Sequence, residues 1–278
     1  MKILITGSKG QLGSELVELL SKDNEVYGFG HEELDITDKN CVIEIISKIV
    51  PDIIIHSAAF TNVDGCESNI KTAFDVNIIG TGNVAMASKK NKSKMVYIST
   101  DYIFDGKKNS PYLESDIPNP VSIYGISKYG GELVGKHFLD NFFIVRTSWL
   151  YGKRGKNFVN TILDIAKDKK ELRVINDQVG SPTYVPDLAK AISALISTKY
   201  YGIYHITNSG ECSWYEFTKK ILKYAEIKDV KVIPISTEEL NRPAPRPKYS
   251  VLANLNLEKR GIHKMRNWDL ALKDFFKK

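Results

Sequence analysis

A tyrosine and a lysine four residues apart, Tyr124 and Lys128, have the types and spacing best suited to chemistry in this chain. On a helix, side chains at this spacing share one face, about one turn apart. A lysine ammonium beside a phenol stabilises the phenolate and lowers the tyrosine pKa from its usual value near ~10. A tyrosine tuned in this way can serve as a general acid or base near neutral pH. The same spacing also occurs by chance in helices without catalytic roles.

A glycine-rich loop stands between the first predicted strand and a predicted helix. Gly7 and Gly10 let the backbone turn and approach a pyrophosphate, and Gly13 permits close packing of helix on strand. The anion would sit where free N–H groups and the helix dipole favour it. A glycine turn without a ligand is the alternative, but the strand–loop–helix setting favours a dinucleotide. The predicted contacts in this loop are Gly7, Lys9, Gly10, Gln11, Leu12 and Gly13.

The sequence favours NADPH over NADH, with NADH expected to be accepted as well. Proteins that bind NAD usually place an acidic residue at the end of the second strand, and residues 28–31 offer no carboxylate there. Lys9, just before Gly10, is either a contact for a 2′-phosphate or a plain surface lysine. Asp35 and Ile36 are expected to border the adenine, although Asp35 could equally be the N-cap of the next helix.

The elements that must position these residues follow an alternating pattern. Short β-branched apolar runs alternate with longer helical stretches, which is typical of a doubly wound parallel sheet. Strands are predicted at residues 2–6, 25–29, 52–57, 94–99 and 142–147, and helices near 11–21, 39–49, 71–90 and 122–140. Later strands at 173–175 and 203–206 would flank a helix at 185–196.

The predicted fold class is α/β, a Rossmann-type doubly wound parallel sheet with a smaller C-terminal substrate-binding lobe. Residues 1–148, with roughly 171–207, are expected to form the NAD(P)-binding domain. Roughly 149–170 and 208–278 are expected to form the substrate-binding lobe. The proline-rich stretch 241–247 is predicted to be an extended arm over a surface, because its three prolines exclude helix and central strand.

Composition is that of a soluble globular protein, with 42% hydrophobic and 26% charged residues. The net charge of +6 comes from scattered basic residues mixed with acidic ones, so no nucleic-acid partner is expected. Cys41, Cys66 and Cys212 have neither disulfide nor metal spacing, which suits a reducing cytosol. No apolar run approaches the ~20 residues of a membrane span, and the N-terminal run is too short for a signal peptide. A cytoplasmic location is therefore expected.

A threonine after the fourth predicted strand, Thr100, would complete a Thr, Tyr and Lys set with Tyr124 and Lys128. With the glycine loop, this set makes the chain resemble the extended short-chain dehydrogenase/reductase superfamily. The resemblance is greatest to one branch, the dTDP-4-dehydrorhamnose reductases, and covers nearly the whole chain. The segments that carry it are 56–61, 75–77, 97–106, 146–152, 157–158, 176–183 and 246–250.

The resemblance implies that a nicotinamide gives hydride to C4 of dTDP-4-dehydro-β-L-rhamnose, the last step of dTDP-rhamnose biosynthesis. Tyr124 would donate a proton to the developing C4 alkoxide, and Lys128 would hold the nicotinamide ribose and stabilise the phenolate. Thr100 would hydrogen-bond the same ketone oxygen. Ala58 and Ala59, after the third strand, would border the cofactor.

Four further residues are predicted to contact the substrate. Asp101 would cap a turn or touch a sugar hydroxyl, and Thr61 would meet the substrate or the nicotinamide. Trp149, just past the fifth strand, borders the ligand crevice, which favours a sugar contact over core packing. Arg246 is either an exposed charge or, as the resemblance implies, a partner for the diphosphate.

Alternative functions are an epimerase, a reductase of another nucleotide-linked keto sugar, and a non-catalytic regulatory subunit of the same fold. Related dehydratases carry a Glu shortly after the site threonine, and here Thr100 is followed by Asp101 and Tyr102, so ketone reduction fits better. The intact Thr, Tyr and Lys set argues against a regulatory subunit. No metal-binding set of carboxylates is apparent, and the sequence leaves a homodimer open.

Overall fold

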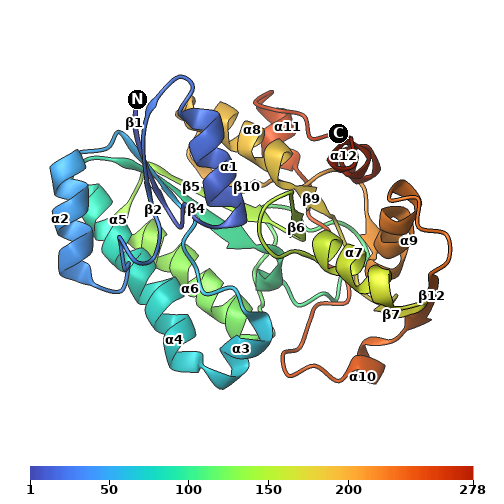
Figure 1. The fold of residues 1–278 in the computed structure, drawn as a ribbon. Coiled ribbons are helices and arrows are strands. Elements are labelled where there is room, and N and C mark those ends of the chain that lie inside the picture. The colour runs from blue at the N-terminus through green and yellow to red at the C-terminus, as the bar shows by residue number, and fades with distance from the viewer. Residues whose placement is uncertain (278) are drawn as a thin grey trace.

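A six-stranded parallel sheet forms the centre of the computed structural model, which describes residues 1–277 (Figure 1). Each neighbouring pair of its strands is parallel, so all carboxyl ends lie at one edge. Doubly wound sheets bind ligands at this edge, where the strand order reverses. Across the sheet, the strands are β10 (Gly202–His205), β5 (Phe142–Thr147), β4 (Lys94–Thr100), β3 (Ile53–His56), β1 (Lys2–Thr6) and β2 (Glu25–Phe29).

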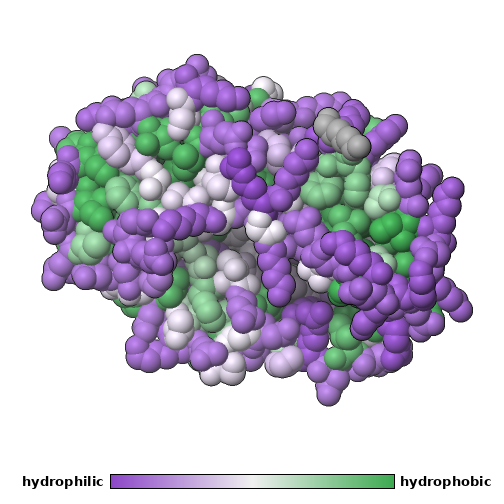
Figure 2. Space-filling model, viewed as in Figure 1, coloured by the Kyte–Doolittle hydropathy of each residue, from purple (hydrophilic) through white to green (hydrophobic). Residues whose placement is uncertain are grey.

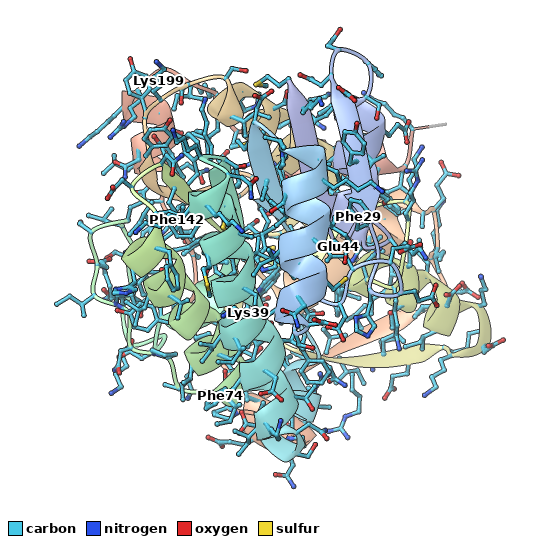
Figure 3. The ribbon with its side chains drawn as sticks, turned by 90° about the vertical axis from the view of Figure 1, so that its left-hand side faces the viewer. Phe29, Lys39, Glu44, Phe74, Phe142 and Lys199 are labelled. Carbon is cyan, nitrogen blue, oxygen red and sulfur yellow. The ribbon has the colours of Figure 1, made fainter. Side chains whose placement is uncertain are left out.

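Helices cover both faces of this sheet, and its central strands are mostly apolar and buried on both faces. On one face, α1 (Gln11–Leu20) and α8 (Val185–Ile196) pack together in one hydrophobic core. On the other, α2 (Lys39–Ile49), α5 (Thr81–Lys90) and α6 (Ile123–Phe138) lie side by side. Figure 3 shows this second face. The sheet is therefore buried between two helical layers.

A second hydrophobic core belongs to the C-terminal part of the chain. It lies beside the main sheet, on the right in Figure 1, and contains three two-stranded sheets. β7 pairs with β12 and β6 with β9 in parallel, whereas β11 pairs with β8 antiparallel. The elements of this part are β6 (Leu150–Tyr151), α7 (Phe158–Asp168), β7 (Glu171–Ile175), β8 (Val179–Gly180), β9 (Thr183–Tyr184), β11 (Cys212–Ser213), α9 (Trp214–Tyr224), β12 (Lys231–Ile235) and α12 (Trp268–Phe275). The short helix α10 (Thr237–Leu240) follows β12 and has no buried residue. α11 (Leu255–Lys259) instead packs on β10, and its Leu257 belongs to the core of the main sheet.

The predicted α/β fold class and parallel sheet are confirmed. The strands predicted at 2–6, 25–29 and 142–147 have the predicted bounds. β4 runs one residue beyond its predicted end at 99, and β3 is shorter by one residue at each end. The predicted helices are found within two residues of their bounds, with one exception.

The exception is the continuous helix predicted at residues 71–90. The structure divides it into α4 (Ile70–Phe74), a π-helical turn η1 (Asp75–Gly80) and α5, and a short helix α3 (Val63–Ser68) precedes it. Within η1, the buried Asn77 side chain bonds the carbonyl of Phe60 at 3.1 Å and the hydroxyl of Ser127 at 2.9 Å. These tertiary bonds hold the backbone in the wider turn, a feature that periodicity cannot reveal.

One part of the predicted domain division differs from the structure. Residues 171–207 were assigned to the first domain, and α8 and β10 do pack with its sheet. β7, however, pairs with β12, and its Leu172 and Val174 lie in the second core. The alternation of exposed and buried residues in β7 fits a strand with one covered face. A strand of the main sheet would be apolar on both faces.

Within residues 1–277, no helix is long and apolar enough to cross a bilayer. The same residues contain no group of three or more His, Cys, Asp or Glu side chains able to hold a metal ion.

Candidate active site

A cavity of about 1490 Å³ lies between the carboxyl edge of the main sheet and the C-terminal part. Figure 2 shows the face of the molecule hollowed between these two parts. Every residue predicted to contact cofactor or substrate lines this one cavity, although the residues span most of the sequence. They are Gly7, Lys9, Gly10, Gln11, Leu12, Gly13, Asp35, Ile36, Ala58, Ala59, Thr61, Thr100, Asp101, Tyr124, Lys128, Trp149 and Arg246.

The glycine loop leaves no room for side chains at two positions. Gly7 has φ +67°, and a Cβ there would lie 2.7 Å from the backbone nitrogen of Ala58. A Cβ on Gly13 would lie 2.2 Å from the carbonyl oxygen of Gly7. Gly10 caps α1 without a side-chain hydrogen bond, so no side chain blocks the approach to the first N–H groups of the helix. This arrangement suits an anionic diphosphate.

The end of β2 departs from its sequence interpretation. A carboxylate is present there: Glu33 Oε2 accepts a hydrogen bond from Gly30 N at 2.8 Å. Its other oxygen lies 2.7 Å from Lys9 Nζ, and Glu32 lies 3.2 Å from the same ammonium. The statement that this strand end lacks an acid is therefore wrong. The missed signal is distance along the chain, since ribose-binding acids stand about 20 residues beyond the glycine loop.

Asp35 caps a turn, and it does not cap a helix. Its Oδ1 accepts hydrogen bonds from Thr37 N at 2.9 Å and Thr37 Oγ1 at 2.8 Å. The N-cap of α2 is Asp38, which accepts from the first-turn N–H groups. Ile36 is buried, and its side chain packs on Gly80 of η1. Asp35 and Ile36 both line the cavity, as the adenine prediction requires.

Tyr124 and Lys128 lie in the first two turns of α6, which begins after the N-cap Ser122. Tyr124 is half-buried and meets the ring of Tyr102 edge-on, with ring centroids 5.5 Å apart. Lys128 is buried, and its Nζ lies 4.2 Å from the centroid of the Tyr97 ring. Within residues 1–277, no hydrogen bond or ion pair engages this Nζ, so its donors are available to a ligand.

The electrostatics of this pair correct the sequence argument. Burial raises the pKa of Tyr124, while the Thr100 hydroxyl acts in the opposite direction. Burial lowers the pKa of Lys128 to about 7, against the attraction of Glu132. The predicted lowering of the Tyr124 pKa by Lys128 is therefore wrong, because burial raises this pKa. A protonated phenol suits a proton donor for ketone reduction.

Thr100 and Asp101 form a polar group beside Tyr124. Thr100 Oγ1 donates to Asp101 Oδ1 at 3.1 Å, and Ser250 Oγ donates to the other oxygen at 2.6 Å. Burial raises the pKa of Asp101 to about 6, and the bonds from Ser250 and Thr100 oppose this shift. The Thr100 hydroxyl must therefore rotate from Asp101 before it can donate to a ketone oxygen.

A buried ion pair between Glu132 and Arg146 lies next to Lys128, and the sequence did not predict it. Glu132 is one turn beyond Lys128 on α6 and accepts from Arg146 Nε at 2.9 Å and Nη2 at 2.7 Å. Ser99 Oγ donates to the same carboxylate at 2.6 Å. Arg146 and Glu132 are both almost fully buried, with 1% and 0% of their side chains exposed. The i,i+4 spacing from Lys128 is the signal that could have identified Glu132.

Trp149 lines the cavity and stacks on another tryptophan. Its ring lies 3.4 Å from that of Trp214, with the planes 7° apart. Its backbone has φ 49°, an uncommon conformation for a residue other than glycine. Both ring systems border the cavity. Trp149 therefore has a core partner and a cavity-facing position together.

Two sets of contacts join the walls of the cavity. On the cofactor side, Gln11 Nε2 donates to the carbonyl of Lys156 at 3.2 Å, and Asn157 Nδ2 donates to Gln11 Oε1 at 3.2 Å. On the opposite side, Arg246 is bonded to Asp64 of α3 through both Nη atoms. Arg246 is therefore held by a carboxylate and is not an exposed charge.

The chain is similar to known proteins over nearly its whole length. The family model described as "RmlD substrate binding domain" matches residues 1–278. The "Spore coat polysaccharide biosynthesis protein SpsK" of Bacillus subtilis is 43% identical, covering 99% of this chain and 96% of that protein. The "dTDP-4-dehydrorhamnose reductase" of Aggregatibacter actinomycetemcomitans is 37% identical, covering 98% of this chain and 97% of that protein.

Solved structures show the same similarity in three dimensions. A crystal structure of dTDP-4-dehydrorhamnose reductase from Bacillus anthracis in complex with NADP has a TM-score of 0.97 and 47% identity. The superposition covers 99% of this chain and 98% of the Bacillus anthracis chain. The UDP-glucose 4-epimerase of Thermus thermophilus, at 22% identity and a TM-score of 0.84, shares the fold.

Proposed function

Since the chain belongs to the RmlD substrate-binding-domain family, we propose that it is an NADPH-dependent dTDP-4-dehydrorhamnose reductase. It reduces the C4 ketone of dTDP-4-dehydro-β-L-rhamnose to dTDP-β-L-rhamnose, the last step of dTDP-rhamnose biosynthesis. The observation that carries this proposal is the meeting of Thr100, Tyr124 and Lys128 with a dinucleotide-binding loop in one cavity.

Bound NADPH supplies the hydride, and the protein supplies orientation and a proton. Tyr124 donates its phenolic proton to the oxygen that becomes the C4 hydroxyl. Thr100 donates a hydrogen bond to the same oxygen as charge develops on it. Lys128 Nζ, which has no hydrogen-bond or ion-pair partner among residues 1–277, binds the nicotinamide ribose and stabilises the phenolate that remains on Tyr124.

The cofactor is held by the N-terminal half of the cavity wall. The backbone from Gly7 to Gly13 binds the diphosphate, while Asp35 and Ile36 border the adenine. Ala58 and Ala59 line the path toward the nicotinamide. The NADP complex of a relative at 47% identity supports NADPH, and the Lys9–Glu33 pair offers an amine for a 2′-phosphate. The carboxylate of the same pair offers acceptors for the ribose hydroxyls of NADH.

The sugar nucleotide occupies the other half of the cavity. Thr61 and Asp101 contact the sugar hydroxyls, and Trp149 covers the sugar ring. Arg246 binds the diphosphate through its guanidinium. We propose accordingly that the main-sheet part binds the dinucleotide and the second core carries the substrate wall. A cytoplasmic location and assembly as a homodimer are further parts of the proposal.

The decisive experiment follows NADPH absorbance with dTDP-4-dehydro-L-rhamnose generated in situ. Oxidation of NADPH coupled to formation of dTDP-L-rhamnose is the expected result. UDP-glucose serves as the control substrate, because an epimerase would convert it without net NADPH consumption. An enzyme that leaves NADPH unoxidised with the keto sugar at micromolar protein contradicts the proposal.

A further inference from the structure

Arg246 is held in place by a carboxylate from a distant part of the chain. Its Nη1 donates to Asp64 Oδ1 at 3.0 Å and its Nη2 to Asp64 Oδ2 at 2.9 Å, so the contact is two-pointed. The two residues are 182 positions apart in sequence. Only 9% of the Arg246 side chain is exposed. A bidentate, largely buried pair of this kind fixes the plane of the guanidinium.

The hydrogen bonds of Arg246 leave part of its guanidinium unused. A guanidinium has five N–H donors. Arg246 uses two on Asp64 and one on the carbonyl of Ala244, which lies 2.9 Å from Nη1. Within residues 1–277, no hydrogen bond of standard distance and angle uses its Nε–H or its second Nη2–H. The Tyr102 hydroxyl lies near the guanidinium, and Arg246 opposes the rise that burial causes in the pKa of Tyr102. The Nε–H and the second Nη2–H form a parallel fork, which matches two oxygens of a phosphate.

The surroundings of this fork favour an anion despite the nearby carboxylate. Arg242 Nη1 lies 3.6 Å from Asp64 Oδ2, so two guanidinium groups share one carboxylate. The sum of +2 and −1 leaves the group with a net charge of +1. The hydrogen bond from Arg246 lowers the pKa of Asp64, which keeps it ionised at neutral pH. Arg242 and Arg246 both line the cavity.

The helix that carries Asp64 is attached to the helix that carries Tyr124, the proposed proton donor. α3, which carries Asp64, is attached to α6 because Glu67 Oε1 accepts from Ile123 N at 2.9 Å. Tyr124 is the next residue of that helix. Arg246 lies outside the helices and strands, but its bonds to Asp64 connect it through α3 to the helix that carries the phenol.

We infer that Asp64 is a positioning residue that orients Arg246 so that its unused fork binds the diphosphate of the sugar nucleotide. This inference rests on the proposed function. Orientation before binding avoids the entropic cost of fixing a long side chain when the ligand arrives. Asp64 also accepts a hydrogen bond from Ala244 N at 3.2 Å, so it holds the backbone beside Arg246 as well as the guanidinium. In this inference Asp64 does not touch the substrate and acts on the diphosphate through Arg246.

Asp64→Asn tests the inference, because the amide keeps the shape of Asp64 and presents an N–H group to one Nη. Calorimetric titration with thymidine 5′-diphosphate, with NADP⁺ present, measures the diphosphate site without turnover. The dissociation constant should rise about tenfold, which corresponds to ~1.4 kcal/mol. KM for the keto sugar should rise in parallel, while kcat changes by less than about twofold and NADP⁺ affinity stays constant.

Two controls separate orientation from general effects. Asp164→Asn removes an equivalent charge from an exposed pair with Lys167 and should leave nucleotide affinity unchanged. In an Arg246→Ala background, Asp64→Asn should have no further effect on affinity, since the residue it positions is gone.

Equal or tighter nucleotide binding by Asp64→Asn would show that Asp64 competes with the diphosphate, and would overturn the inference. An undiminished effect in the Arg246→Ala background would also overturn it. Nucleotide binding by the wild type without any keto-sugar reduction would instead contradict the proposed function and leave the role of Asp64 standing.

Discussion

Tyr124 is the proton donor in the proposed reaction, and its hydroxyl can be removed without disturbing the ring packing against Tyr102. Tyr124→Phe should lower kcat by roughly 10²–10⁴, the loss typical of a missing general acid. Cofactor affinity should change little because Lys128 is retained. Steady-state kinetics with fluorescence titration of NADPH measure both quantities. Near-normal turnover in this variant would assign the proton to another group.

Lys128 predicts a pH dependence of cofactor binding. Burial lowers the pKa of Lys128 to about 7, so its side chain is mostly protonated below that pH and loses its charge above it. NADH should therefore bind more tightly at about pH 6 than at about pH 8. NADH is the suitable ligand because it lacks the 2′-phosphate, which itself titrates near ~6. In Lys128→Met, binding should be weaker and independent of pH, and a retained slope would exclude Lys128 as its cause.

Lys9 and Glu33 should set the choice between the two nicotinamide cofactors. Their contact of 2.7 Å is solvent-exposed, so it contributes little to stability and separates readily. Lys9→Ala should raise KM for NADPH by about tenfold and leave that for NADH nearly unchanged. Glu33→Gln should do the reverse. Kinetics with both cofactors test the pair, and unaltered preference in Lys9→Ala would remove Lys9 from cofactor selection.

At the scale of elements, the Glu132–Arg146 pair joins α6 to β5 in the interior. Arg146→Met leaves the Glu132 carboxylate buried without its partner and should lower the free energy of unfolding by about 3–5 kcal/mol. The double variant with Glu132→Gln should recover much of this loss, because no uncompensated charge remains. Urea unfolding measures both, with the exposed Asp164–Lys167 pair as control. Similar stability of the single and double variants would show that pairing is not the cause.

Local sequence predicted the elements that depend on local patterns. The apolar runs of β1 and β5 and the glycine loop before α1 each carry their own signal, so their bounds could be predicted closely. The Thr, Tyr and Lys set could be predicted as well, since its members lie at strand ends or on one helix face. The structure brings all of these residues to one cavity.

Features that depend on partners remote in sequence were not predictable in this way. The π-helical turn η1 needs contacts of Asn77 with Phe60 and Ser127. The pairing of Arg246 with Asp64 joins positions 182 apart. The sequence pattern of β7 predicts a strand, but it does not predict which sheet that strand joins. Burial likewise reversed the expected pKa of Tyr124, because desolvation outweighs any stabilisation of its charged form.

At the scale of the whole molecule, polar contacts between segments remote in sequence lie on two sides of the cavity. On the cofactor side, the loop 152–157 reaches α1 through Gln11, and its Arg154 also pairs with Glu18. NADPH binding beneath this loop should slow amide hydrogen exchange in residues 152–157. Exchange measured by mass spectrometry, with and without NADPH, tests this expectation. The buried strand β5 is the internal reference, and unchanged loop exchange would place the cofactor away from the loop.

The stacked rings of Trp149 and Trp214 have an optical consequence. They are two of only three tryptophans in the chain, and both border the cavity. Indoles stacked in parallel at 3.4 Å couple their electronic transitions, and the light they emit falls where reduced nicotinamide absorbs. The arrival of a cofactor or a sugar should therefore change the intrinsic fluorescence and the near-ultraviolet dichroism, and titrations that record both test this expectation. The protein contains its own spectroscopic reporter of cavity occupancy, without any attached label.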